Sequence, residues 1–232
     1  MDKEGFQISE QEIEAIDRLR PIWFETVAGL GGNIENAEVE FKNIVKMYRQ
    51  GDARAYHNIL HVDRIVSLIR KISHLARRPH ALTAAAIGHD IDYIAGSPTN
   101  EFDSGETSGA ILERLGVGAE PILEIKRLIM ITKDHTPGED DVDGKILTDG
   151  DFEILGSPPP IYRWYSTGIY AENVGSGKVS VADYKTGRGR YLSSWLKQIE
   201  ESSLFFTPEI RDALQPQALE NITEEMEFIA TL

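Results

Sequence analysis

Apolar residues recur at intervals of three and four through most of the chain, and this spacing constrains the fold more than any other feature. Such spacing places side chains on one face of an α-helix. No stretch shows the sustained alternation of apolar and polar residues that marks a half-buried strand. The 232-residue chain is therefore predicted to be an all-α helical bundle of one domain, residues 1–232, with a core at about 35–205 and terminal helices packed on it. The clearest apolar face comprises Val62, Ile65, Val66, Ile69 and Ile72.

Two short clusters of histidine and carboxylate lie on these predicted helices. His57 and His61 are four residues apart in a helix expected over residues 54–75, which would place both on the edge of its apolar face. His89 and Asp90 end an alanine-rich helix, whose small side chains permit close packing. A lone histidine is usually a core or surface residue, but a buried ionised carboxylate needs a partner. Imidazole and carboxylate are common ligands of divalent metals, so these residues are candidates for a metal site.

Other local signals divide the rest of the chain. Ser9 and Glu12 form a capping box that starts a helix, and Pro21 predicts a kink or break within it. The acidic residues 139–143 and the glycine-rich residues 174–189 are expected to be surface loops. Further helices are expected over residues 33–50, where Gly51-Asp52 follows, and over 79–93, 105–115, 119–133, 158–170, 191–204 and 215–229.

Composition limits the functions open to the chain. There is no cysteine, so disulfides and thiolate zinc sites are excluded and any metal is held by nitrogen and oxygen. The net charge of −14 repels phosphate backbones, so duplex nucleic acid is not an expected partner. No apolar run of about 18 residues predicts a membrane span. With the polar N-terminus Met1–Gly5, which lacks the apolar core of a secretory signal, we expect a cytoplasmic protein that does not bind membranes.

The segment Tyr56–His61, followed by His89-Asp90 and a distant aspartate, resembles the HD superfamily of metal-dependent phosphohydrolases. The closer match is a bacterial single-domain HD family of about this length. Tyr56–His61 is also similar to the signature of the cyclic-nucleotide phosphodiesterases, which are distant relatives. The resemblance continues through Thr132–His135 and Asp149–Phe152. It implies an HD-type helical bundle that holds a divalent metal.

The resemblance also implies individual ligands. His61, His89 and Asp90 would be three of them, and Asp90 is counted among the catalytic residues as well. The fourth would be Asp149 or Asp151, and the pattern in relatives selects Asp151 because an apolar residue follows it. Asp149 would then hydrogen-bond a ligand histidine. Two imidazoles and two carboxylates suit Mn, Mg, Fe, Ni or Zn.

Further residues are expected around the metal. His57 matches the residue that protonates the leaving oxygen in the phosphodiesterases, and its alternative role is hydrogen-bonding support. Lys133 and Arg188 are candidates to bind phosphate, or are exposed surface charges. His135 and Asp92 are candidates to support a second metal.

Three functions remain open at this point. The first is hydrolysis of a phosphate ester or anhydride of a small phosphorylated or nucleotide-like molecule by metal-activated water. The second is a di-iron oxygenase of the same fold, which would need extra ligands such as His135 and Asp92. The third is a non-catalytic binding module stabilised by metal. This third possibility is suggested by Ser104-Gly105, which occupies the position where the family usually has an Asn-Glu pair. The oligomeric state is left open.

Overall fold

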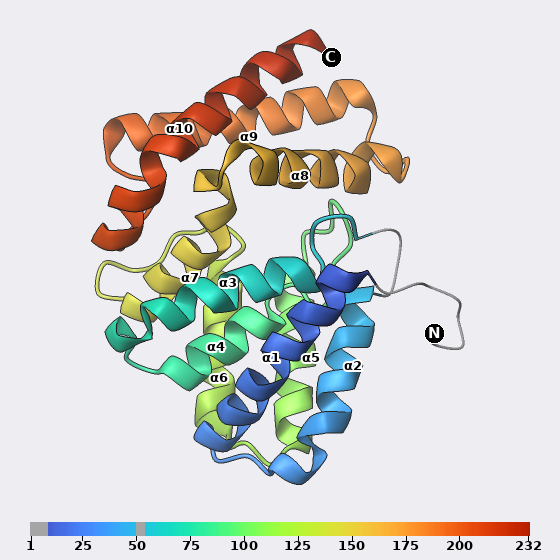
Figure 1. Cartoon of the computed structure of the whole chain (residues 1–232), viewed down its shortest axis with the longest axis vertical. Coiled ribbons are helices and arrows are strands. Elements are labelled where there is room, and N and C mark those ends of the chain that lie inside the picture. The colour runs from blue at the N-terminus through green and yellow to red at the C-terminus, as the bar shows by residue number, and fades with distance from the viewer. Residues whose placement is uncertain (1–8, 50–53) are drawn as a thin grey trace.

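The structure is a computed structural model that describes residues 9–49 and 54–232. Every regular element in these two ranges is helical and none is a strand, which confirms the all-α prediction (Figure 1). The sequence signals at Met1–Gly5 and at Gly51-Asp52 lie outside the described residues. None of the described helices combines the length and the apolar character that crossing a membrane requires.

Short turns of 3₁₀ or π helix connect several of the α-helices. The elements in chain order are α1 (Glu10–Gly29), η1 (Ile34–Asn36), α2 (Ala37–Arg49), α3 (Ile59–Lys71), η2 (Ser73–Leu75), α4 (Pro79–Gly88), α5 (Asn100–Arg114), α6 (Ala119–Ile131), α7 (Val142–Phe152), η3 (Glu153–Gly156), α8 (Pro159–Tyr170), η4 (Ala171–Gly175, a π-helical turn), α9 (Val181–Glu201) and α10 (Pro208–Thr231).

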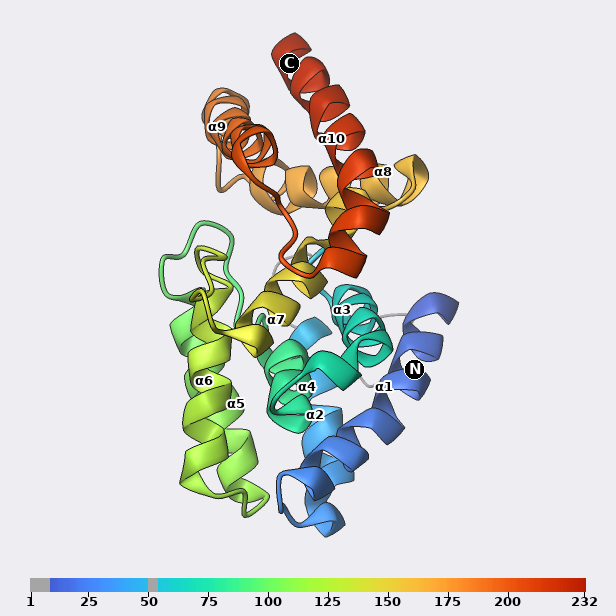
Figure 2. The ribbon, with the colours of Figure 1, turned by 90° about the vertical axis from the view of Figure 1, so that its left-hand side faces the viewer.

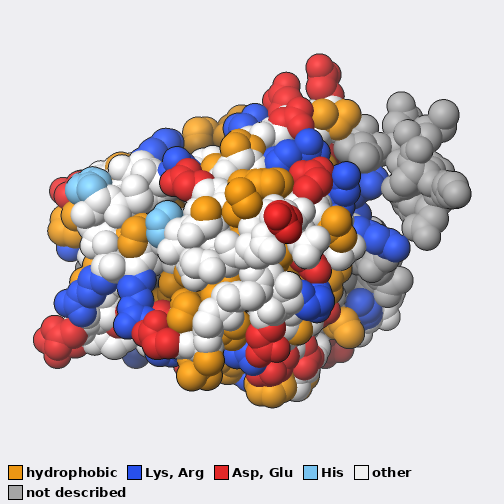
Figure 3. Space-filling view, turned by 90° about the horizontal axis from the view of Figure 1, so that it is seen from below, with side chains coloured by type: hydrophobic (Ala, Val, Ile, Leu, Met, Phe, Trp, Pro, Cys, Tyr) orange, Lys and Arg blue, Asp and Glu red, His pale blue; other side chains and the backbone are white. Residues whose placement is uncertain are grey.

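The molecule has two parts along its length. Helices α1 to α7 with their turns, residues 9–49 and 54–157, form a bundle that we call the helical body (Figure 1). Helices α8 to α10 with η4, residues 158–232, lie across one end of it and form the C-terminal layer. Figure 2 shows α5 beside α6 on one flank of the body, and α10 packs on both α9 and η3. The opposite end of the molecule carries acidic and basic side chains side by side (Figure 3).

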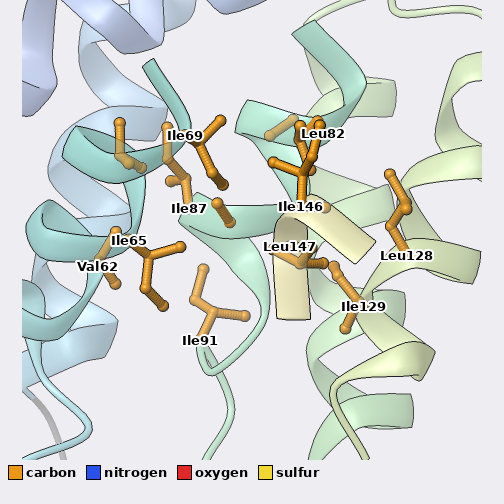
Figure 4. Packing of buried hydrophobic residues seen from close by; sticks show 14 of the residues in the cluster. Val62, Ile65, Ile69, Leu82, Ile87, Ile91, Leu128, Ile129, Ile146 and Leu147 are labelled. Atoms are coloured by element: carbon orange, nitrogen blue, oxygen red, sulfur yellow. The ribbon is translucent and has the colours of Figure 1, made fainter. Parts of the chain in front are cut away.

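Buried aliphatic side chains from α3, α4, α6 and α7 form the core of the helical body (Figure 4). Each large aliphatic side chain that is fully buried contributes about 1.5–3 kcal/mol. Gly150 brings α7 close to α3, since a Cβ added there would lie only 3.0 Å from Ile65 Cγ2. The predicted apolar face of α3 is confirmed, because Val62, Ile65, Val66, Ile69 and Ile72 are all buried.

The first helix begins as predicted but is not broken. Ser9 and Glu12 make the reciprocal bonds of a capping box. Helix α1 then continues through Pro21 to Gly29. Leu19 and Trp23 are buried on either side of the proline, and we attribute the continuity to this packing, which offsets the hydrogen bond that proline cannot make.

Several predicted boundaries are wrong. Most of the expected loop over residues 174–189 is helical, because α9 begins at Val181 with the Ser180 side chain as its cap. The expected acidic loop ends early, since Asp141 caps α7 in the same way. Helix α5 starts at Asn100 rather than at residue 105. In each case side-chain capping or packing outweighs the local glycine or charge signal.

Candidate metal centre

Three of the predicted ligands come together from three helices. His61 lies on α3, His89 directly follows α4 and Asp151 lies on α7. The Nε2 atoms of His61 and His89 are 3.2 Å apart. Asp151 Oδ1 is 3.1 Å from His61 Nε2 and 3.8 Å from His89 Nε2. One donor atom from each residue therefore fits within 4.8 Å of the others, so the three could hold a metal ion.

Asp90 borders the same cluster. Its Oδ2 atom is 3.1 Å from His89 Nε2 and 3.7 Å from His61 Nε2. Arg54 fixes the backbone here, because its guanidinium donates to the carbonyls of Asp90 at 2.8 Å and Ile91 at 2.9 Å. Helix α4 ends at Gly88, so His89 and Asp90 lie just after it rather than within the predicted helix. The turn directs both side chains toward His61.

The hydrogen bonds of the two imidazoles suit metal binding. His89 Nδ1 is 3.0 Å from the Ala86 carbonyl, and because a carbonyl only accepts, Nδ1 carries a proton and the lone pair of the neutral ring lies on Nε2. His61 Nδ1 is 2.8 Å from the Tyr56 hydroxyl. When His61 Nε2 serves as a ligand, its Nδ1–H donates to that oxygen. Orienting partners of this kind are usual behind metal-bound histidines.

The charges at the cluster favour a cation. Burial lowers the pKa of His61, whereas at His89 the carboxylates of Asp90 and Asp151 outweigh burial and raise the pKa to about 9. Burial also opposes ionisation of Asp90 and Asp151, but the neighbouring histidines more than compensate and hold the pKa of each carboxyl low. Two ionised carboxylates thus face two ring nitrogens, a donor set that suits a divalent transition metal.

His57 does not share a helical face with His61, so that prediction is wrong. Asn58 has an extended backbone and its side chain accepts the Leu60 N–H, which makes it the cap of α3. His57 therefore precedes the helix. Its ring stacks on that of Tyr93, with centroids 3.9 Å apart.

Glu172 holds His57 and is not predicted from the sequence. Its Oε2 is 2.5 Å from His57 Nδ1, and its Oε1 accepts the backbone N–H groups of Tyr56 at 2.7 Å and His57 at 2.9 Å. Burial lowers the pKa of His57, but Glu172 and the other nearby carboxylates outweigh it and raise that pKa. Glu172 lies 115 residues from His57 in the chain. The only sequence signal is a single acidic residue among mainly apolar neighbours.

The two residues proposed to support a second metal differ in position. His135 Nε2 is 2.9 Å from Asp151 Oδ2, so His135 contacts the second carboxylate oxygen of Asp151, not the one that approaches His61. Its backbone has a φ of 55°, and its ring stacks on Phe152. Asp92 is bound by the Thr107 hydroxyl and lines a separate pocket beside Arg54. Among the described residues, neither belongs to a group able to hold an ion.

Two further expectations are corrected. Asp149 does not hydrogen-bond a ligand histidine, because its two oxygens accept the N–H groups of Phe206 and Thr207 at 2.7 Å each. It thereby fixes the start of α10, and its burial raises its pKa to about 6. The ammonium group of Lys133 donates to the Pro98 carbonyl at 2.8 Å on the surface, away from the candidate metal centre.

A cavity of about 460 Å³ adjoins the cluster. Asp151, His57 and His135 line it together with side chains of the C-terminal layer, among them Arg188. Arg188 is buried, and its Nε and Nη2 donate to the Glu225 carboxylate at 2.9 and 3.0 Å. The structure thus brings Arg188 to the cavity, as expected, but with its charge already paired.

Comparison of the chain with protein-family models, with curated proteins and with solved structures gives no match. The resemblance to HD phosphohydrolases therefore rests on the motif residues of the sequence alone.

Proposed function

We propose that the protein is a metal-dependent phosphohydrolase of the HD type, which hydrolyses a phosphate ester or anhydride of a small nucleotide-like molecule. One observation carries the proposal: His61, His89, Asp90 and Asp151 converge, and Asp151 lines a cavity that His57 also lines. The donor set indicates Mn, Fe, Mg, Ni or Zn. The proposal includes a cytoplasmic location, with which the absence of cysteine is compatible.

The residues of the cluster have distinct tasks in this proposal. His61, His89, Asp90 and Asp151 would hold the ion. A bound divalent ion lowers the pKa of a water ligand and offsets charge on phosphoryl oxygens. His135 keeps Asp151 oriented through its second carboxylate oxygen.

His57 would supply the proton to the leaving oxygen. Its Nδ1 is bound to Glu172, so Nε2 is the ring nitrogen left to donate to a substrate. The upward shift in the pKa of His57 favours the protonated ring that a general acid requires. Stacking on Tyr93 fixes the plane of the ring.

The di-iron alternative receives less support. It needs further ligands beyond the four, and Asp92 instead pairs with Thr107. The non-catalytic alternative does not require a cavity beside the ligands, whereas the protein has one lined by His57 and Asp151.

Two measurements test the proposal. The metal content of the purified protein and of His61→Ala is determined by elemental analysis, with the exposed His74→Ala as the control. Phosphate release is then measured with Mn, Mg, Ni and Co on nucleotides, diphosphates and phosphodiesters. We expect metal-dependent release that His61→Ala abolishes and His74→Ala retains. If no metal supports release from any of these compounds, the proposed hydrolase activity is rejected.

A further inference from the structure

Tyrosine, phenylalanine and tryptophan rings form a large part of the wall of the cavity beside the candidate metal centre. Beyond the residues of the cluster, α8 and α9 contribute several of them, and the segments around His57 and Asp151 contribute the others. Its volume of about 460 Å³ falls within the roughly 300–1,000 Å³ typical of small-molecule sites. The rings that line it are Tyr56, Tyr93, Phe152, Tyr165, Tyr184, Tyr191 and Trp195.

These rings brace one another around the cavity. Trp195 meets Phe152 edge to face with centroids 5.5 Å apart, and Tyr191 lies 4.3 Å from Trp195. On the other side Tyr165 meets Tyr56 at 4.7 Å, also edge to face. Tyrosine phenols have an ordinary pKa of about 10, so those of the wall are neutral at physiological pH. The wall therefore offers fixed, uncharged π surfaces.

The described lining of the cavity offers few unpaired lysine or arginine side chains that could bind additional phosphates. Arg188 is the single lysine or arginine among its described lining residues, and Glu225 already takes two of its donors. The guanidinium also lies over the ring of Tyr165, 5.0 Å from the centroid. Asp183, another lining residue, adds a negative charge. A phosphate chain extending from the metal centre would meet these groups rather than free cations.

We propose that the site takes compounds in which one phosphate is esterified to a body that carries a flat aromatic ring system, and that it discriminates against polyphosphates and small polar phosphates. This inference rests on the proposed hydrolase function. The phosphate would lie at the ligand cluster and the body against Trp195 and Tyr191. Flat π systems gain most from such a wall, whereas a small polar body leaves it uncovered.

The reaction balances with one water per ester. The water oxygen becomes bonded to phosphorus, and the bond from phosphorus to the oxygen of the aromatic body breaks. That oxygen leaves with a proton from His57, and the ring regains a proton from the attacking water through solvent. The products are inorganic phosphate and the free hydroxyl compound.

The test uses the Mn²⁺-loaded full chain and two matched pairs of compounds. 1-Naphthyl phosphate and glycerol 3-phosphate differ in the body, whereas adenosine 5′-monophosphate and adenosine 5′-triphosphate differ in the phosphates. We expect kcat/KM for the first member of each pair to exceed that of the second by tenfold or more. Equal values within both pairs would overturn the inference.

A variant pair locates the effect. Tyr191 is about two-fifths exposed, so Tyr191→Leu removes its ring with little cost to folding. It should raise KM for 1-naphthyl phosphate severalfold and leave glycerol 3-phosphate unchanged. Phe102→Leu, at an exposed aromatic outside the cavity lining, is the control and should change neither. An equal effect of Tyr191→Leu on both compounds would contradict the proposed contact.

A binding measurement separates this inference from the hydrolase proposal. Adenosine and glycerol, neither of which carries a phosphate, are titrated into the protein by calorimetry. Binding of adenosine that Tyr191→Leu weakens supports the aromatic site even if no compound releases phosphate, in which case the hydrolase proposal alone fails. Phosphate release without any adenosine binding refutes the aromatic site alone.

Discussion

The helical body and the C-terminal layer contribute different sets of groups in and around the same cavity, although aromatic rings of both parts line it. The body supplies His61, His89, Asp90 and Asp151, whose charges and lone pairs remain directed at one another. The layer supplies aromatic rings and Arg188, whose charge is paired within the layer. The body thus presents groups that suit a metal ion, whereas the layer presents aromatic rings and a guanidinium group that is already paired. Under the proposed function, the body would hold the metal and the layer would help to select the substrate.

Two of the contacts that join these parts are made by carboxylates. Glu172 of the layer holds His57 of the body, and Asp149 of the body holds the start of α10. The predictions below ask whether the two parts can be disturbed separately, beginning with the largest expected effect.

The largest effect is expected for the ligand cluster of the body. His61→Ala removes a ring nitrogen that no neighbour replaces. Metal content should fall sharply, and the rate should drop by about 10³-fold, since metal stabilisation of the transition state is worth several kcal/mol. Elemental analysis and phosphate release check this. If His61→Ala retains its metal, the ligand assignment is wrong.

His57 lies where body and layer meet and should separate chemistry from metal binding. His57→Ala removes the proposed proton donor, which typically costs about 10²- to 10⁴-fold in rate. The ligand nitrogens of His61 and His89 remain, so metal content should stay at the level of the unaltered protein. Loss of metal together with rate would instead make His57 a support for the ligands.

Asp149 should affect stability without affecting the metal. Asp149→Ala leaves the N–H groups of Phe206 and Thr207 without their acceptor, at about 1–3 kcal/mol for each. We expect the free energy of unfolding, measured with urea, to fall by about 2–4 kcal/mol in total. The exposed Asp140→Ala is the matched control. A change in metal content would contradict the separation of this contact from the cluster.

Glu172 gives a prediction for pH dependence. Because Glu172 helps to raise the pKa of His57, Glu172→Gln should lower that pKa. A general acid is active below its pKa, so the basic limb of the pH–rate profile should move to lower pH. At neutral pH the rate should fall by about tenfold, the lower end for an orienting partner. An unshifted basic limb would mean that His57 is not the group titrating there.

The smallest effect is expected for Lys133, which belongs to the body but contacts neither side of the cavity. Lys133→Ala removes one surface hydrogen bond to Pro98. Its stability should stay within about 0.5 kcal/mol of the unaltered protein, as for most surface substitutions. Unchanged kcat and KM would remove Lys133 from the candidates for phosphate binding, whereas a raised KM would restore it.

Short-range patterns explain which groups could be predicted. His61 and His89-Asp90 stand in segments with apolar helical periodicity and were candidates on that ground, whereas Asp151 was selected over Asp149 only by the resemblance to the HD family. The all-α class followed from the same periodicity. The role expected for Asp149 was wrong, since two aspartates two residues apart look alike in sequence, and only packing sends one to α10 and the other to the cluster.

The sequence by itself determined the helical class, the apolar faces of the helices and the histidine and aspartate residues that meet at the candidate metal centre. The tertiary structure alone decided that Glu172 reaches His57 and that the rings of α9 face the cluster. It also decided that His57 precedes α3. Periodicity reports only on residues one or two turns apart, whereas these contacts depend on how helices far apart in the chain pack, and that packing is set by the shared core.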